Sequence, residues 1–593
     1  MASSKRHLFR SPGTRFAILV LATVIAAMAR AQGAGVPTPT GRIAPEAPPP
    51  HSKYYRTAAI NEITVTPAPA GLLRSTGVKV AMRDGVKLSV NIYRPNAPGA
   101  YPVILSVTRY SKDSYGPGRY QGWAKASGFE IGRMSISEYT PFEAPDPAFW
   151  VPHGYVVIHA DIRGAYESEG DIGPIAPQDA QDYYDLIEWA GTQYWSNGNV
   201  GLSGVSYLAF SQWPVAALRP PHLKAIIPWE GVTDHYRDNA FHGGIPETNF
   251  RTNAYTLGLE DTRHPGSGLS ENYALMLRKH PLFDDYWWPR AANLELIRVP
   301  ALICATWSAQ GNHSRGSFEG FKRIRSKDKW MVSHGRVEWP TYYAPESTAL
   351  QLRFFDRFLK ELDNGMESVP RVQYDVRQSR DEYSVHFAKD WPIPGTKYVR
   401  LFLDAANHSL VKVLPRTEST TSYESTQDEH VEFDYTFAQA TTLIGNMVLH
   451  LWVSAEQADD LDLFVGIRKF DPRGDEVYFT GFGGNPNDIV TRGWLRVSAR
   501  ERDEQQSTPW QPYLLHSHVR KINPAETVPV DVEILPSGTS FEKGAKLRLV
   551  IQGRDVVPNP ILRHDDSVNR GTHTMHTGGR FDSFLLVPDV SLQ

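Results

Sequence analysis

Hydrophobic and polar positions alternate in two different ways along the chain. Before about residue 370, short apolar runs rich in β-branched residues alternate with helical patterns. The run 155–160 is apolar almost throughout, as expected of a strand buried on both faces, and a helical pattern follows at 178–190. Further strands are predicted at 199–203, 223–228, 301–305 and 329–333, and a further helix at 207–218. This alternation predicts a mostly parallel, doubly wound α/β sheet.

Two stretches interrupt this rhythm. Between about residues 234 and 296 the strand pattern gives way to aromatic, polar and helix-like segments, and residues 116–149 form a second interruption. We expect the longer stretch to be a helical cap inserted above the sheet, because segments of this kind commonly control substrate access.

Beyond residue 370 the hydrophobic period changes to two. Every second residue is apolar in two clear examples, Leu461, Leu463, Val465 and Ile467, and Val528, Val530, Val532 and Ile534. Such alternation is typical of half-buried antiparallel strands. Residues 371–593 are therefore predicted to form an all-β domain, a β-sandwich or jelly roll.

The first residues have the pattern of an export signal. Basic residues precede an apolar run at 16–29, and Ala29, Arg30 and Ala31 form a small-x-small cleavage pattern. The run of about 14 residues is shorter than the about 20 that a membrane-spanning helix needs. Residues 1–31 are predicted to be a signal peptide, so that the mature protein is secreted or periplasmic and keeps no stable membrane anchor. Residues 32–75 are predicted to be an extended, proline-rich leader.

Charge and cysteine content exclude several classes of protein. The 593 residues include 62 Lys and Arg and 65 Asp and Glu, and this net charge of −3 gives no indication of a nucleic-acid partner. The single cysteine, Cys304, forms no intramolecular disulfide and is expected to be a buried, inert thiol. No cofactor and no metal are predicted, because no Cys/His cluster has the spacing of zinc ligands. The polar C-terminal residues His564, Asp565, Asp566, His573 and His576 are expected to be solvated loop residues.

A serine stands between a predicted strand and a predicted helix, which is the setting of a nucleophile elbow. Gly204 precedes Ser206 by two positions and Ala209 follows it by three, so small residues surround the sharp turn. Leu208 occupies the position where the general G-x-S-x-G motif has glycine. A serine that only caps a helix would fit the same pattern.

Several motifs together resemble the cocaine esterase / Xaa-Pro dipeptidyl-peptidase family of α/β-hydrolases. They are Thr-Arg-Tyr-Ser-Lys at 108–112, Asp-Ile-Arg-Gly at 161–164, Gly-Val-Ser-Tyr-Leu-Ala at 204–209, Asp-Leu-Asp-Leu-Phe-Val at 460–465 and His-Thr-Gly-Gly-Arg-Phe-Asp-Ser at 576–583. The resemblance implies an α/β-hydrolase domain at 76–370 with a helical cap at about 234–296, followed by a jelly-roll domain at 371–593. It also implies acyl transfer from esters or amides through an acyl-serine.

The resemblance assigns roles to three residues. Ser206 matches the nucleophile, and Tyr110 matches the tyrosine whose hydroxyl serves the oxyanion hole. The backbone N–H of Tyr207 is the expected second donor, because a tetrahedral oxyanion needs two fixed donors and the amide after the nucleophile is well placed.

The general base is expected just after the last parallel strand, from which an imidazole can reach Ser206. His334 ends the predicted strand at 329–333 and is favoured, with His313 as the competitor. The residues around His334 differ from the Gly-Pro-Trp-x-His of the family, which leaves the register open.

The acid of the triad is where the sequence departs most from the family. The family has Gly-Trp-x-Asp after the penultimate strand, whereas this chain has Ala309 at the position of the aspartate. Glu230, after the strand at 223–228, is favoured, Asp234 and Glu338 are alternatives, and a site without an acid stays open.

The leading hypothesis is an exported serine hydrolase that acts on a small-molecule ester or amide without a cofactor. A Xaa-Pro dipeptidyl-peptidase or β-lactam acylase is the alternative within the class, and it would need acidic cap residues to bind a substrate amine. The candidates for that role are Glu247, Glu260, Asp261, Asp284 and Asp285. The alternative from another class is a degenerate hydrolase that binds a ligand such as a carbohydrate. The substrate and the oligomeric state stay open.

Overall fold

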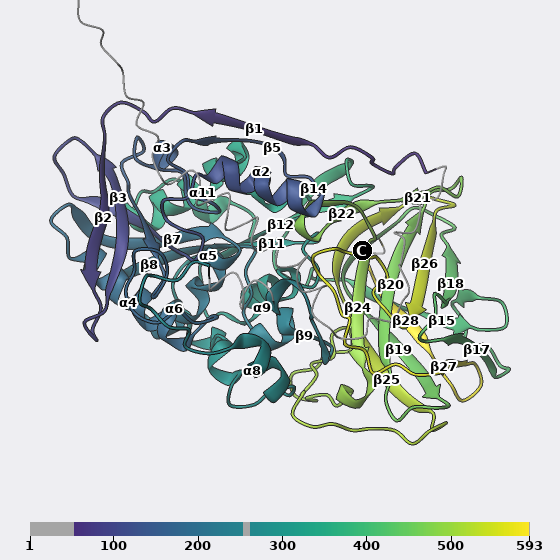
Figure 1. Ribbon diagram of the computed structural model, residues 1–593. Helices are drawn as coiled ribbons and strands as arrows, with labels where there is room; N and C mark the ends of the chain where they lie inside the picture. The colour runs from purple at the N-terminus through teal and green to yellow at the C-terminus, as the bar shows by residue number, and fades with distance from the viewer. Residues whose placement is uncertain (1–51, 253–260, 592–593) are drawn as a thin grey trace, which may run out of the picture.

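The computed structural model describes residues 52–252 and 261–591 and shows two adjoining regions (Figure 1). An α/β region occupies the purple-to-teal part of the ribbon, and an all-β region occupies the green-to-yellow part. The predicted signal peptide and the leader up to residue 51 lie outside the described residues. Within the described ranges, no helix combines the length and the apolar composition that crossing a bilayer requires.

The α/β region is built on one sheet in which strands distant in sequence are neighbours. Its order is β2 (Leu72–Ala81), β3 (Lys87–Pro95), β6 (Val156–Asp161), β4 (Tyr101–Thr108), β7 (Ser196–Val205), β8 (Leu223–Trp229), β11 (Ala301–Thr306), β12 (Lys329–His334), β13 (Val372–Arg377) and β14 (Tyr383–Ala388). The strands from β6 to β13 pair in parallel, and antiparallel strands flank them. This arrangement confirms the predicted α/β class, and the sheet continues past residue 370 into β14.

Helices cover both faces of this sheet, as a doubly wound fold requires. On one face lie α4 (Pro177–Gly191), α6 (Gln212–Leu218) and α9 (Ser314–Arg323), and on the other lie α2 (Gly116–Ser127), α3 (Pro147–Trp150), α10 (Glu338–Tyr343) and α11 (Pro345–Leu359). Side chains of β6 alternate between the two cores: Ile158 belongs to the first and Val157 to the second. The apolar run at 155–160 is explained by this double burial.

The two interruptions of the sequence pattern are insertions. The first contains α2, β5 (Gly132–Ser137) and α3, and β5 pairs in parallel with β1 (Asn61–Thr66), which runs along the top of Figure 1. The described part of 234–296 contains a π-helical turn (Tyr236–Ala240), β9 (Phe241–His242), β10 (Ile245–Pro246), α8 (Tyr273–Lys279) and two short 3₁₀ turns. It is thus mostly irregular, and the helical cap remains a prediction.

The C-terminal region is a β-sandwich. One sheet contains β16 (Ser409–Val411), β15 (Lys397–Asp404), β28 (Phe584–Asp589), β19 (Thr441–Ala455) and β25 (Val528–Phe541), with β27 (Thr572–Thr577) and β17 (Ser419–Glu424) at one end. The other contains β18 (His430–Thr436), β26 (Lys546–Gln552), β20 (Asp462–Phe470), β21 (Glu476–Val477) and β24 (Thr491–Arg496). A short hairpin joins β22 (Phe479–Gly481) to β23 (Asn485–Asp488). The predicted alternation is confirmed, since Leu463 and Val530 belong to one core between the sheets.

The outer face of β20 is buried as well, which the period-two pattern does not indicate. Phe464 packs with Trp494 and with Ile245 from the insertion of the α/β region. The turn between β9 and β10 approaches β24 so closely that a Cβ at Gly243 would lie 2.0 Å from the carbonyl oxygen of Trp494. The two regions therefore share a closely packed boundary next to the insertion.

The described part of the leader also bridges the two regions. Lys53 forms an ion pair with Asp471 of the sandwich at 2.7 Å, and Arg56 forms one with Glu130 of the α/β region at 2.7 Å. The chain then enters β1 and β2, so the leader ends in regular structure earlier than residue 75.

Candidate active site

Ser206 occupies the sharp turn between β7 and α5 (Tyr207–Phe210). Its φ of 56° and ψ of −115° are a conformation that a residue with a side chain rarely adopts. The turn needs glycine two residues earlier: Gly204 has a φ of 146°, and a Cβ there would lie 2.5 Å from Cβ of Leu208. The backbone therefore has the nucleophile-elbow form that the sequence indicates, although Leu208 replaces the second glycine.

The side chain of Ser206 contacts His313 rather than His334. Its Oγ lies in hydrogen-bond contact with Nε2 of His313 at 3.1 Å. His313 is the N-cap residue of α9, and its backbone N–H donates to the carbonyl of Ala309 at 2.9 Å. The loop after β11, where the family places its aspartate, thus folds into a turn that brings a histidine to the serine.

The expectation that His334 is the general base is corrected by this geometry. His334 is the last residue of β12 and is fully buried at the level of the sheet. Its Nδ1 accepts the backbone N–H of Arg336 at 3.2 Å, and its Nε2 lies 2.9 Å from Oε1 of Glu230. Both ring nitrogens of His334 face these partners. The imidazole that contacts Ser206 is that of His313, which follows the neighbouring strand β11.

Two carboxylates face Nδ1 of His313. Oε2 of Glu338 lies 3.0 Å away, and Oε2 of Glu230 lies 3.6 Å away. Glu338 opens α10, and Glu230 directly follows β8. Glu230, the acid favoured from the sequence, therefore lies at the site, but Glu338 is nearer to the imidazole. Asp234 has a different role, because its carboxylate pairs with Arg237 at 2.7 Å.

Burial and mutual attraction set the protonation of this cluster. Burial lowers the pKa of His313, but the Glu338 and Glu230 carboxylates outweigh it and raise that pKa to about 9. Burial raises the pKa of Glu338. Burial acts in the same direction on Glu230, yet His334 and His313 hold its pKa below the usual value. A third buried carboxyl, Glu143, accepts the indole N–H of Trp339 at 3.0 Å, and burial and Glu338 raise its pKa well above the usual value.

Tyr110 and Tyr207, the residues expected to hold the oxyanion, lie beside each other. Tyr110 follows β4, and its ring packs edge-on against the ring of Tyr207, with 6.2 Å between centroids. The ring of Phe142 also packs edge-on against the ring of Tyr110, with 5.2 Å between centroids. The structure thus brings Tyr110 beside the residue that follows the nucleophile.

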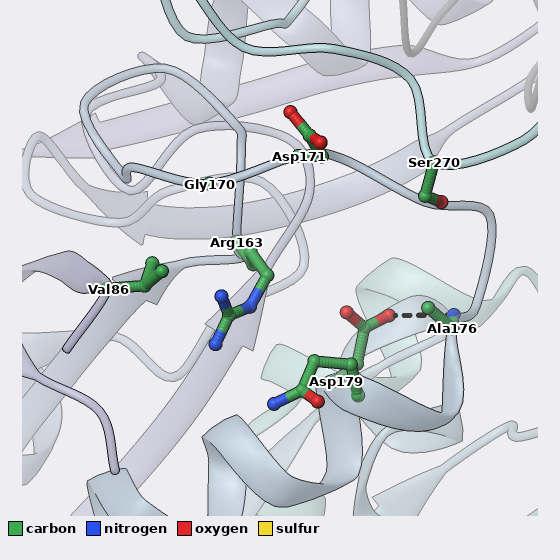
Figure 2. A pocket seen from close by; sticks show the side chains of 8 residues that line it. Val86, Arg163, Gly170, Asp171, Ala176, Asp179 and Ser270 are labelled. Atoms are coloured by element: carbon green, nitrogen blue, oxygen red, sulfur yellow. Dashed lines mark hydrogen bonds between the residues drawn. The ribbon is translucent and has the colours of Figure 1, made fainter. Parts of the chain in front are cut away.

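A pocket opens behind Tyr207. It has a volume of about 410 Å³, and Figure 2 shows Arg163, Asp171 and Asp179 among its lining residues, with the Asp179 carboxylate directed to the backbone of Ala176. Asp179 accepts the backbone N–H of Ala176 at 3.1 Å and the hydroxyl of Tyr207 at 3.4 Å. Burial and Asp182 raise the pKa of Asp179 to about 7. Asp179 lies in the first turn of α4 and belongs to none of the sequence motifs described above.

The cluster also contains groups that metal ions bind in other proteins. Glu230, Cys304 and His334, and Glu230, His313 and Glu338, each bring three ligand atoms within 4.8 Å of one another. In the second group, Nδ1 of His313 lies 3.0 Å from Glu338 and 3.6 Å from Glu230, and Nε2 of the same ring contacts Ser206. This arrangement suits proton transfer. Cys304 is buried as expected, and burial raises its pKa well above the usual value.

One other expectation from the sequence is wrong. His564 and His573 were expected in solvated loops, but both are buried, and His564 contacts His242 and Asp555 at 2.7 and 2.9 Å. Among the acidic cap residues, the carboxylate of Glu247 accepts the backbone N–H groups of residues 249–251, and Asp284 contacts His280 at 2.6 Å. Glu260 lies outside the described residues.

Comparison with known proteins agrees with this geometry. Residues 84–336 match the X-Pro dipeptidyl-peptidase (S15 family), and residues 364–586 match the X-Pro dipeptidyl-peptidase C-terminal non-catalytic domain. A CocE/NonD family hydrolase from Staphylococcus aureus superposes with a TM-score of 0.83 and is 44% identical, over 88% of this chain and 94% of that one.

Two curated relatives have named activities. Cocaine esterase from a Rhodococcus species is 28% identical over 414 residues, which are 59% of this chain and 67% of the relative. A Xaa-Pro dipeptidyl-peptidase from Streptococcus thermophilus is 20% identical over 560 residues, which are 80% of this chain and 73% of the relative. The elbow serine, its histidine contact and these similarities lead to one conclusion: the chain belongs to the CocE/NonD family of serine hydrolases, which includes esterases and Xaa-Pro dipeptidyl-peptidases.

Proposed function

We propose that the chain is an exported hydrolase that cleaves small esters or amides through an acyl-serine on Ser206. The observation that carries the proposal is the 3.1 Å contact between Ser206 Oγ, on its strained turn, and Nε2 of His313. A strained serine in hydrogen-bond contact with a buried imidazole is the arrangement that activates a hydroxyl nucleophile. The names of the relatives, an esterase and a dipeptidyl-peptidase, support both substrate classes.

The proposed reaction has two halves. Ser206 Oγ attacks the acyl carbon while its proton moves to Nε2 of His313, and the oxyanion is held by the hydroxyl of Tyr110 and the backbone N–H of Tyr207. His313 then gives this proton to the departing alcohol or amine, which leaves the acyl group on Ser206. In the second half, water gives a proton to His313 and attacks the acyl carbon, and the proton returns to Ser206 as the acid is released.

Glu338 is the proposed orienting acid of this site. Its Oε2 lies 3.0 Å from Nδ1 of His313, so it can accept the proton on that nitrogen and leave Nε2 as the acceptor for Ser206. Its carboxylate also balances the positive charge that His313 acquires in the transition state. The described part of the 234–296 insertion, including the π-helical turn, borders this cluster of strand ends, and we propose that it is the cap that shapes substrate access.

The test is hydrolysis of a short-chain p-nitrophenyl ester and labelling by a fluorophosphonate, in the chain from Gln32 onward. We expect Ser206→Ala to lose both labelling and at least about 10⁴-fold in kcat. Ser211→Ala is the matched control, because its hydroxyl donates to the carbonyl of Leu208 at 3.3 Å and its loss should leave both readouts unchanged.

Two outcomes would contradict the proposal. Labelling that persists in Ser206→Ala would place the nucleophile elsewhere. A wild-type chain that is folded but neither labelled nor active would favour the alternative hypothesis of a ligand-binding protein. Export is tested separately, since it predicts that the mature protein begins at Gln32.

A further inference from the structure

The cluster contains one carboxylate and one histidine more than a serine–histidine–acid site requires. Glu230 lies between two imidazoles, with Oε1 at 2.9 Å from Nε2 of His334 and Oε2 at 3.6 Å from Nδ1 of His313. Glu338 already faces the same nitrogen of His313 at 3.0 Å. The Glu230–His334 pair is therefore not needed to orient His313, and its burial calls for another explanation.

The backbone holds Glu230 in an unusual conformation at this position. Its φ is 57°, in the left-handed region that residues with a side chain seldom adopt. Its backbone N–H donates to the carbonyl of Cys304 at 2.9 Å, which ties the residue to β11. Such strain persists only where the surroundings enforce it, and it is common at functional sites.

His334 faces Glu230 through its Nε2, which lies 2.9 Å from Oε1 of the carboxylate. Its Nδ1 accepts the backbone N–H of Arg336 at 3.2 Å, so a neutral ring carries its proton on Nε2, the nitrogen that faces Glu230. A buried carboxylate keeps its charge when it is supplied with such a donor, because the hydrogen bond compensates for lost hydration.

The other titratable groups around the pair have partners of their own or are neutral. The thiol of Cys304 lies within 4.8 Å of the Glu230 carboxylate, and burial raises its pKa well above the usual value, so it is uncharged. Asp375 forms an ion pair with Arg336 at 3.3 Å. Glu143 accepts the indole N–H of Trp339 at 3.0 Å, and burial and Glu338 raise its pKa well above the usual value. Glu230 and Glu338 are thus the carboxyl groups of this cluster that contact His313.

We propose that Glu230 and His334 form a second carboxylate–histidine pair, which favours the protonated form of His313. His334 is a positioning residue that keeps Glu230 ionised, and ionised Glu230 stabilises the imidazolium form of His313 together with Glu338. This inference rests on the proposed function, because it concerns the base of the same site. Its consequence is a site that becomes active only as the pH rises, since His313 must lose its proton before it can accept that of Ser206.

The pH dependence of Ser206 labelling tests the pair without knowledge of the substrate. The second-order rate of fluorophosphonate labelling is measured against pH for the wild type, His334→Phe, His334→Gln and Glu230→Gln. His334→Phe removes the donor, so buried Glu230 takes up a proton and no longer favours imidazolium. We expect the rise of the labelling rate with pH, the rising limb of the profile, to shift to lower pH by about one pH unit or more. Glu230→Gln should move it in the same direction, and His334→Gln, which can still donate at the Nε2 position, should stay near the wild type.

The double variant Glu230→Gln/His334→Phe separates this role from a merely structural one. If His334 acts through Glu230, the double variant shifts the limb no further than Glu230→Gln alone. Two shifts that add, or a limb that stays unchanged in folded Glu230→Gln, would overturn the proposal. Should His334→Phe fail to fold, the profiles of Glu230→Gln and His334→Gln still decide the question.

The two proposals fail in different ways. Labelled wild type with the same limb in every variant would refute the second pair and leave the acyl-serine mechanism standing. Wild type that is not labelled at any pH would refute both.

Discussion

The substitution Glu338→Gln tests most directly which carboxylate completes the site. It keeps the shape of the side chain and removes the charge that faces Nδ1 of His313 at 3.0 Å. In an effective dielectric constant of about 20, two unit charges at 3.0 Å attract by about 5.5 kcal/mol. Since about 1.4 kcal/mol corresponds to a factor of ten in rate, complete loss of this attraction in the transition state would lower kcat by about 10⁴.

Glu230 makes the expected loss of kcat in Glu338→Gln smaller than this value. It stays 3.6 Å from the same nitrogen, and a charge there is worth about 4.6 kcal/mol on the same scale. Part of the imidazolium charge thus remains balanced, so we expect kcat of Glu338→Gln to fall by about 10² to 10⁴. Glu230→Gln should lower it less, because its carboxylate is farther from His313 and is shared with His334.

The assay is kcat for a short-chain p-nitrophenyl ester on the alkaline plateau of each variant. Comparison on the plateau matters because both substitutions also lower the pKa of His313, which would mask a loss of kcat at neutral pH. Thermal unfolding of each variant checks that the fold is kept. The reasoning is refuted if Glu338→Gln keeps kcat within about tenfold of the wild type while Glu230→Gln loses about 10³ or more; Glu230 would then be the orienting acid.

Three further predictions follow from other parts of the structure. Tyr110→Phe should lower kcat of ester hydrolysis by about 10² to 10³ with little change in KM, because its hydroxyl acts on charge that forms in the transition state; an unchanged kcat would exclude Tyr110 from the oxyanion hole. Gly204→Ala should lower the unfolding temperature, since its Cβ would lie 2.5 Å from Cβ of Leu208 at a φ of 146°, a conflict worth about 2 to 4 kcal/mol, and a variant as stable as the wild type would contradict the strained elbow. Burial and His564 lower the pKa of His242 from 6.5 to about 3 in the folded protein. The unfolded chain therefore binds the proton more strongly than the folded one. The contribution of neutral His242 to the free energy of unfolding is complete above pH 6.5 and is lost as the pH falls toward 3. The urea midpoint of His242→Gln should therefore fall less than that of the wild type between pH 7 and pH 4, and equal slopes would refute this origin.

The period of the apolar residues is enough to predict the architecture, because it shows whether one or both faces of each strand are buried. The apolar run at 155–160 became β6, with Val157 and Ile158 in the cores on opposite faces of the sheet. The alternation at 461–467 became the inward face of β20 in the sandwich. The period-two pattern did not indicate that Phe464 on the outer face is also buried, because that burial comes from Ile245 of the other region and so depends on how the two regions pack.

The position of Ser206 on the elbow is predictable for a local reason, and the histidine that contacts it is not. Ser206 is fixed by its immediate neighbours, since Gly204 and the following helix determine the turn. His313 is fixed by the path of a loop: β11 ends at Thr306, and the turn closed by the carbonyl of Ala309 carries the histidine to the serine. His334 directly ends a strand and matched the usual position of a base, but a residue at the strand end stays at the level of the sheet, where it meets Glu230.

The site uses four adjacent strand ends, which explains how roles can move between them. Ser206 follows β7, Glu230 follows β8, His313 follows β11 and Glu338 follows β12, and these strands are neighbours in that order. Neighbouring strands lie about 4.8 Å apart, so side chains from adjacent ends reach the same point above the sheet. The chemistry requires an imidazole at Ser206 and a carboxylate at its other nitrogen, and it does not require that a given strand supply either. Ala309 stands at the position of the family's aspartate, and here the loop after β11 brings a histidine to Ser206 and the segment after β12 brings a carboxylate to that histidine. In the proposed mechanism, the two roles are therefore exchanged relative to the order expected from the motif.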